Sequence, residues 1–136
     1  MDKYLGKWKL LKNIDFDNFL KYINYGWIKR KLAVSSNIDV TIEKTDVENK
    51  YKRIIESTFL NREEFFVVDG QFHTTVDKTQ KSYTFKDGVL YTEAKQTNGI
   101  QWSETSELEN NILTITRNWI ENNAKKTSKQ IFKHIS

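Results

Sequence analysis

The most restrictive feature of this sequence is the alternation of apolar and polar residues that begins after Asn37. Segments such as 40–42, 83–85 and 113–116 alternate in this way and are rich in β-branched and aromatic residues, which is typical of strands with one buried face. Turn-forming residues separate the segments at intervals of about ten to twenty residues, as in an antiparallel meander. They are Asp46 to Asn49, Asp69-Gly70, Asp87-Gly88, Asn98-Gly99, Asn110-Asn111 and Asn122-Asn123. With the opening run 5–12, the pattern predicts about ten strands.

Residues 15–35 interrupt the strand pattern and are expected to form two short helices. Apolar residues occupy the i, i+3, i+4 and i+7 positions of the first helix, and Asp15 is its predicted N-cap. These apolar residues are Phe16, Phe19, Leu20 and Ile23. After Gly26, a second segment at 27–34 combines apolar and basic residues. The two segments predict a helix-turn-helix inserted after the first strand.

An antiparallel meander of this size most simply removes its exposed edges by closing into a barrel. A barrel this wide encloses more space than its own side chains fill, so we expect an internal ligand cavity. Proline is absent and only five glycines occur, so we expect no flexible linker. We therefore predict an all-β fold with one domain over residues 1–136 and a helical cap at about 15–35.

Composition argues against several classes of protein. The chain has no cysteine and only two histidines, His73 and His134, so we expect neither disulfide bonds nor a metal site. No run approaches the ~20 apolar residues of a membrane-spanning helix, and the N-terminus lacks a secretory signal core. The cytoplasm is therefore the expected compartment, with the nucleus left open as a second one. The net charge of +4 permits nucleic-acid binding but does not require it.

Several short segments follow one another in an order that is typical of a known family. They are 6–10 (GKWKL), Phe16-Asp17, Phe19-Leu20, 29–33 (KRKLA), 56–59 (ESTF) with Asn61, 87–90 (DGVL) and 129–133 (KQIFK). In these segments the chain resembles the intracellular lipid-binding proteins, which include the cytosolic fatty-acid-binding and the cellular retinoid-binding proteins. Asp15 departs from the family pattern, which has Asn, His or Gly there. The resemblance implies a ten-stranded antiparallel up-and-down barrel, the calycin or lipocalin-like clam, capped by a helix-turn-helix. It also implies ligand entry past the helices, no cofactor and no enzyme activity.

Strand alternation and hairpin pairing predict which side chains share the barrel interior. A turn at 109–112 sets facing pairs on the two strands that flank it. The predicted pairs are Leu108 with Leu113, Ser106 with Ile115, Glu104 with Arg117, and Trp102 with Trp119. The next hairpin has its tip at Asn122-Asn123 and sets three further pairs. These place Phe132 beside Leu113, Gln130 beside Ile115, and Ser128 beside Arg117.

The resemblance also implies a carboxylate clamp, and this chain changes it. In fatty-acid-binding members two arginines and a tyrosine hold the ligand carboxylate, the last two as an Arg-x-Tyr pair on the final strand. Ser106, Gln130 and Phe132 align with these positions. Gln130 resembles a glutamine of the cellular retinol-binding proteins. However, Ser106 stands at the position of their second glutamine, and Val40 stands at the position of a ligand-proximal lysine. A fatty acid is the first expectation for the ligand, and retinol or another neutral lipid held by Gln130 is the alternative.

Arg117 is expected to point inward, one row from the usual arginine position and opposite Glu104. It can bind the ligand carboxylate, or Glu104 can neutralise it, which we favour because an unpaired buried carboxylate is costly. A slip in register that exposes both side chains is a third option. The candidate ligand-binding residues are Gln130, Ser106, Arg117, Phe132, Glu104, Ile115, Trp102, Phe16 and Phe59. For the last two, on the cap and at the portal, core packing is an equal explanation.

These patterns predict a monomeric carrier that binds a long apolar ligand noncovalently, such as a fatty acid. Four basic residues on the predicted cap suit transient contact with anionic membranes, although a solvated helix face explains them equally well. They are Lys21, Lys29, Arg30 and Lys31. A barrel that binds single-stranded nucleic acid on its outer face is the candidate of another class. It is disfavoured, because Trp102, Trp119 and Phe132 are expected to face inward.

Overall fold

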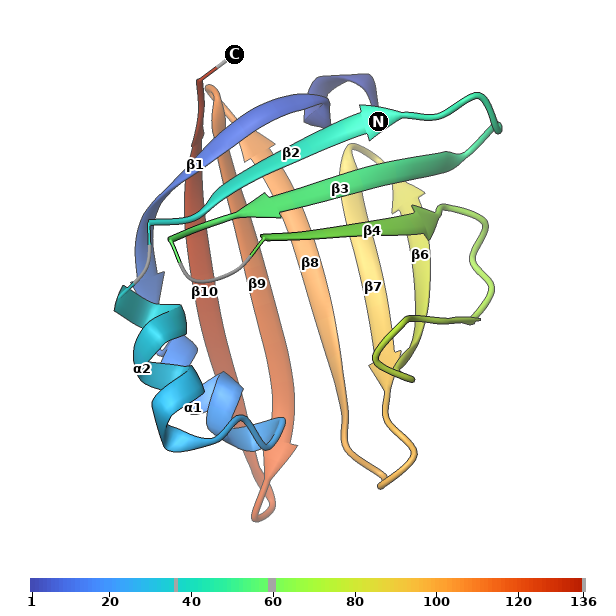
Figure 1. Cartoon of the computed structure of the whole chain (residues 1–136). Coiled ribbons are helices and arrows are strands. Elements are labelled where there is room, and N and C mark those ends of the chain that lie inside the picture. The colour runs from blue at the N-terminus through green and yellow to red at the C-terminus, as the bar shows by residue number, and fades with distance from the viewer. Residues whose placement is uncertain (36, 59–60, 136) are drawn as a thin grey trace.

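The computed structural model describes residues 1–35, 37–58 and 61–135, and shows a barrel of ten antiparallel strands with two α-helices at one end (Figure 1). The strands are β1 (Gly6–Ile14), β2 (Asp39–Lys44), β3 (Lys50–Glu56), β4 (Asn61–Val67), β5 (His73–Thr74), β6 (Gln80–Lys86), β7 (Val89–Lys95), β8 (Gln101–Glu109), β9 (Ile112–Glu121) and β10 (Ala124–His134). The helices are α1 (Phe16–Tyr22) and α2 (Trp27–Ser35), and a short 3-10 turn, η1 (Asp2–Tyr4), precedes β1. The predicted all-β barrel and its helical cap are confirmed.

The strands form one sheet in the order β4-β3-β2-β1-β10-β9-β8-β7-β6-β5. Strand β1 joins its two halves by pairing with both β2 and β10. The two edge strands of the sheet, β4 and β5, do not pair with each other. Side-chain contacts between β4 and its neighbours close this side of the barrel instead. The ring of Phe66 on β4 lies 4.8 Å from that of Tyr83 on β6, and the Arg53 guanidinium lies 4.6 Å from the centre of the Phe66 ring. The barrel is therefore nearly closed.

The predicted pairing across the last two hairpins is confirmed in its central part. Glu104 lies opposite Arg117, and Gln130 lies beside Ile115. The remaining matches are Ser106 with Ile115, Leu108 with Leu113, Ser128 with Arg117, and Phe132 with Leu113. The pairing of β8 with β9 ends at Ser103 and Asn118, one step short of the predicted Trp102–Trp119 pair. Both indole rings instead pack on Phe19 of α1, at centroid distances of 5.4 and 5.5 Å.

The two helices form the cap, although Asp15 does not cap α1 as predicted. Asp15 occupies the N-cap position, but its side chain makes no capping hydrogen bond. Its φ of 55° is left-handed, whereas a capping side chain reaches the first amides of a helix from an extended backbone. Arg30 of α2 donates a 3.1 Å hydrogen bond to Asp17 of α1 and so ties the helices together. Within the described ranges, neither helix has the length and apolar character needed to cross a bilayer.

Two apolar clusters fill opposite parts of the interior. One lies under the helices and includes Phe19, Trp102 and Trp119. The other surrounds Trp8, whose side chain is fully buried and whose indole N–H donates to the Tyr4 carbonyl at 2.9 Å. Phe132 belongs to this second cluster. Between the clusters the inward side chains include polar and charged groups, which are described next.

Candidate functional site

A chain of hydrogen-bonded side chains runs along the inner wall of the barrel, and we call it the interior polar network. The indole N–H of Trp102 and Nε of Arg117 each donate to Oε1 of Glu104 at 3.1 Å. Arg117 also donates from Nη1 to Oε1 of Gln130 at 2.8 Å. The Gln130 amide in turn donates to Oδ1 of Asn13 at 3.1 Å. The network therefore links β8, β9, β10 and β1.

Strand alternation explains why these polar residues meet inside the protein. Glu104, Arg117 and Gln130 occupy the same parity as the buried residues Trp102, Leu113 and Phe132 of their own strands. The side chains of Glu104 and Arg117 are each only 14% exposed. Buried polar groups are costly without partners, so mutual hydrogen bonding is what makes this arrangement stable.

Glu104 is ionised, and nearby positive charges stabilise its carboxylate. Burial by itself would raise the pKa of Glu104, but the nearby charges of Arg117 and Lys81 outweigh it and bring the pKa to about 2. Arg117 is thus paired with Glu104, the alternative that the sequence favoured, and neither side chain is exposed by a slip in register. The Arg117 guanidinium also lies 5.3 Å from the ring centres of Phe16 and Phe19 on α1.

A second ion pair inside the barrel was not predicted from the sequence. Nη1 of Arg53 on β3 lies 2.9 Å from Oε1 of Glu64 on β4, and Arg62 approaches the other oxygen of Glu64 at 3.6 Å. Burial alone would lower the pKa of Arg53, but Tyr83 and Glu64 raise it. The parity that Arg53 shares with Tyr51, and Glu64 with Phe66, is the sequence feature that could have identified this pair.

The hydroxyl of Ser128 stands apart from the interior polar network. Ser128 is 1% exposed, pairs with Arg117 across β9 and β10, and its Oγ has no hydrogen-bond partner among the described residues. A buried hydroxyl without a partner is uncommon in proteins. It is thus a polar atom that a ligand or a water molecule can satisfy.

The remaining candidate residues divide between the interior and the cap. Ser106 and Phe132 are buried, and Ile115 packs against the apolar cluster around Trp8. Phe16, the first residue of α1, is buried and belongs to the cluster with Trp102. Phe59 lies outside the described residues. The structure thus brings Glu104, Arg117, Gln130 and Trp102 into direct contact.

The basic residues of the cap differ in their contacts. Arg30 is engaged by Asp17 and the Tyr25 carbonyl, and its side chain is only 17% exposed. Lys31 lies 5.1 Å from the ring centre of Trp27, which is itself 63% exposed. Ile28 is similarly exposed. The outer face of α2 therefore combines lysine with exposed apolar side chains.

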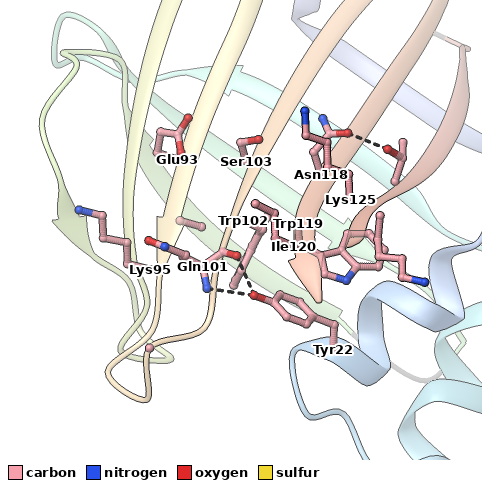
Figure 2. Close-up of a pocket in the computed structure, with 14 residues that line it drawn as sticks. Tyr22, Glu93, Lys95, Gln101, Trp102, Ser103, Asn118, Trp119, Ile120 and Lys125 are labelled. Atoms are coloured by element: carbon pink, nitrogen blue, oxygen red, sulfur yellow. Dashed lines mark hydrogen bonds between the residues drawn. The ribbon is translucent and has the colours of Figure 1, made fainter. Parts of the chain in front are cut away.

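A surface cleft of about 610 Å³ opens at the helix end of the barrel, between α1 and the ends of β7 to β10 (Figure 2). The Tyr22 side chain lines this cleft, and its hydroxyl donates a hydrogen bond to the Gln101 carbonyl at 2.9 Å. The Tyr22 ring also stacks on Trp119 at a centroid distance of 5.6 Å. Tyr22 therefore holds α1 against the strands at this end.

Comparison with known proteins identifies the family. No family model matches the chain. An adipocyte fatty acid-binding protein of Pygoscelis papua is 34% identical over 92 residues, which cover 65% of this chain and 68% of that protein. The chain belongs to the fatty-acid-binding protein family. Fatty acid-binding protein homolog 7 of Caenorhabditis elegans is 28% identical over 125 residues, 90% of this chain and 82% of the homolog.

Solved structures of fatty-acid-binding proteins share the whole fold. Fatty-acid-binding protein 1 of Echinococcus granulosus superposes with a TM-score of 0.82 at 20% identity, with full coverage of both chains. A Schistosoma mansoni fatty acid binding protein, solved in complex with arachidonic acid, superposes with a TM-score of 0.81 at 21% identity, covering 100% of this chain and 98% of the other. The barrel described here is thus the architecture of this family.

Proposed function

We propose that this protein is a carrier that binds a long-chain fatty acid noncovalently inside the barrel and delivers it to other sites. The observation that carries the proposal is the placement of charged and hydrogen-bonding side chains inside a barrel of the fatty-acid-binding family, including the Ser128 hydroxyl, which has no hydrogen-bond partner in the described part of the chain. The Schistosoma relative, solved with arachidonic acid, supports a fatty acid as the ligand class. Binding requires no cofactor and no chemical step, so the proposed role is that of a carrier and not an enzyme.

Most of the affinity in this proposal comes from removing the acyl chain from water. Each buried methylene contributes roughly 0.8 kcal/mol, so a long chain far exceeds what one polar contact supplies. The polar groups of the interior then fix the position of the carboxylate. The hydroxyl of Ser128 and the amide of Gln130 add neutral hydrogen-bonding groups on β10.

Delivery is proposed to use contact between the cap and anionic membranes. Trp27 and Ile28 are exposed on α2, with Lys29 and Lys31 beside them in sequence. Aromatic and aliphatic side chains insert at the headgroup level, and each nearby lysine contributes about 1 kcal/mol of attraction to anionic lipid. Arg30 contributes less, because Asp17 already engages it. The cytoplasm and a monomeric state belong to the same proposal, and cell fractionation and gel filtration test them.

Native mass spectrometry of the protein as purified from cells tests the proposed function. Fatty acid that co-purifies and is released by gentle activation is the expected result. Addition of oleate to delipidated protein is expected to give one or two bound molecules. If delipidated, folded protein binds no oleate at concentrations below its micellar range, the carrier proposal is wrong.

A further inference from the structure

The charges inside the barrel are unequally paired. Arg117 is paired with Glu104, and Arg53 and Arg62 share Glu64. Lys81 on β6 also has inward parity, since it alternates with Tyr83 and Phe85, which pack in the interior. No carboxylate oxygen of the described residues lies within ion-pair distance of Lys81.

Lys81 lies beside Trp102, and its charge lowers the pKa of the carboxyl groups of Glu104, Glu64 and Asp77 without an ion pair to any of them. It is half-buried, pairs with the buried Ala94 of β7, and Ala94 pairs with Trp102 of β8. Nζ of Lys81 lies 6.0 Å from the ring centre of Trp102, at the outer limit of a cation–π contact. The ammonium therefore stands close enough to the network to lower the pKa of Glu104, but Glu104 makes its ion pair with Arg117 and not with Lys81.

Arg117 is poorly placed to serve a ligand carboxylate. Its Nε and Nη1 are already occupied by Glu104 and Gln130. A carboxylate that approached it would also meet the ionised Glu104, and two like charges in a poorly solvated interior repel strongly. Displacing Glu104 would leave that carboxylate buried without its partner, which is costly. The arginine that strand alternation predicted inside the barrel is thus already paired within the protein.

We infer that Lys81, beside Trp102, receives the carboxylate of the bound fatty acid. The inference deepens the proposed function and rests on it. The Lys81–Ala94–Trp102 row lies one row from Glu104 and Arg117, and two rows from Ser106 and Gln130. One row is two residues along a strand, or about 7 Å. In this assignment the ligand carboxylate lies about 14 Å from Ser106 and Gln130. It lies at the end of the barrel that carries the helices.

Paired ligands that differ only in headgroup charge test this assignment. Oleate and methyl oleate are titrated into delipidated wild-type protein, Lys81→Met, Lys81→Arg and Lys86→Met. Lys86 lies on the same strand with outward parity and is exposed, so its variant is the matched control. Circular dichroism and thermal unfolding establish that each variant is folded.

The wild-type protein is expected to prefer oleate over methyl oleate. A charge-assisted hydrogen bond lost in Lys81→Met is expected to weaken oleate binding about 10- to 100-fold and leave methyl oleate within about 2-fold. Lys81→Arg is expected to keep the preference, as is Lys86→Met. Oleate binding that is unchanged in a folded Lys81→Met protein overturns the inference but leaves the carrier function standing. Failure of the wild-type protein to bind either ligand overturns both. If Lys81→Met does not fold, loss of the oleate preference in Lys81→Gln supports the inference and its retention overturns it.

Discussion

Replacing Glu104 by glutamine removes one charge from the interior while nearly preserving the shape of the side chain. Glutamine resembles the protonated acid, so the variant isolates the contribution of ionised Glu104. The pKa of Glu104 falls from its ordinary value of 4.5 to about 2, since the charges of Arg117 and Lys81 outweigh the effect of burial. At about 1.4 kcal/mol for each pH unit, this corresponds to about 3 kcal/mol of stability at neutral pH.

The sign of the pH dependence follows from the lowered pKa. A carboxyl group whose pKa is lower in the folded state stabilises the fold above its unfolded value, and this contribution is lost as the pH falls through the folded value. The difference in unfolding free energy between wild type and Glu104→Gln is therefore expected to be about 3 kcal/mol at pH 7 and only about 1 kcal/mol at pH 3. Glu64, Asp69 and Asp77 also have lowered pKa values, but they are common to both proteins and cancel.

Urea unfolding followed by tryptophan fluorescence at the two pH values measures this difference. The exposed Glu107 lies on the same strand, and Glu107→Gln is the control, with an expected change within about 0.5 kcal/mol. A Glu104→Gln protein as stable as wild type at pH 7, or a difference that stays constant down to pH 3, would refute the assignment of an ionised, paired Glu104.

Three further predictions concern the core, a turn and the cap. Trp8→Ala should lower the unfolding free energy by about 3–5 kcal/mol, because a fully buried indole is lost, and a cost below 1 kcal/mol in urea unfolding would contradict the packing. Gly88→Ala should cost about 1 kcal/mol by the same assay, because Gly88 has a φ of +81° although its surroundings are open, so a neutral result would argue against this turn. Replacing Lys29 and Lys31 together by glutamate should slow oleate transfer to anionic vesicles but not to zwitterionic ones. Equal slowing with both vesicle types would exclude the electrostatic role.

The hairpins that carry Glu104, Arg117 and Gln130 could be predicted because their turns are short and specific. Asn110-Asn111 and Asn122-Asn123 all adopt positive φ, between 51° and 64°, as the tight turns favoured in hairpins require. A two-residue turn of this type fixes the register of both strands, and alternation then determines which side chains face inward.

Other parts of the site could not be derived in this way. Strands β4 and β6 meet without a hydrogen-bonded ladder, so no register rule predicts that Phe66 contacts Tyr83 or that Arg53 packs on both rings. The Arg53–Glu64 pair lies on strands joined through residues 57–60, which contain no recognisable two-residue turn. The left-handed backbone of Asp15 is equally invisible in a pattern of residue types.

The position of Arg117 beneath α1 has a consequence for how the barrel can open. Its guanidinium carries hydrogen bonds to Glu104 and Gln130 on one side and supports the rings of Phe16 and Phe19 on the other. One side chain therefore belongs both to the interior and to the seat of the first helix. A bound ligand that displaces this guanidinium is expected to move α1 as well, because Phe16 and Phe19 of α1 pack against it. A filled barrel is therefore expected to differ from an empty one at the cap, which is the surface proposed to contact membranes.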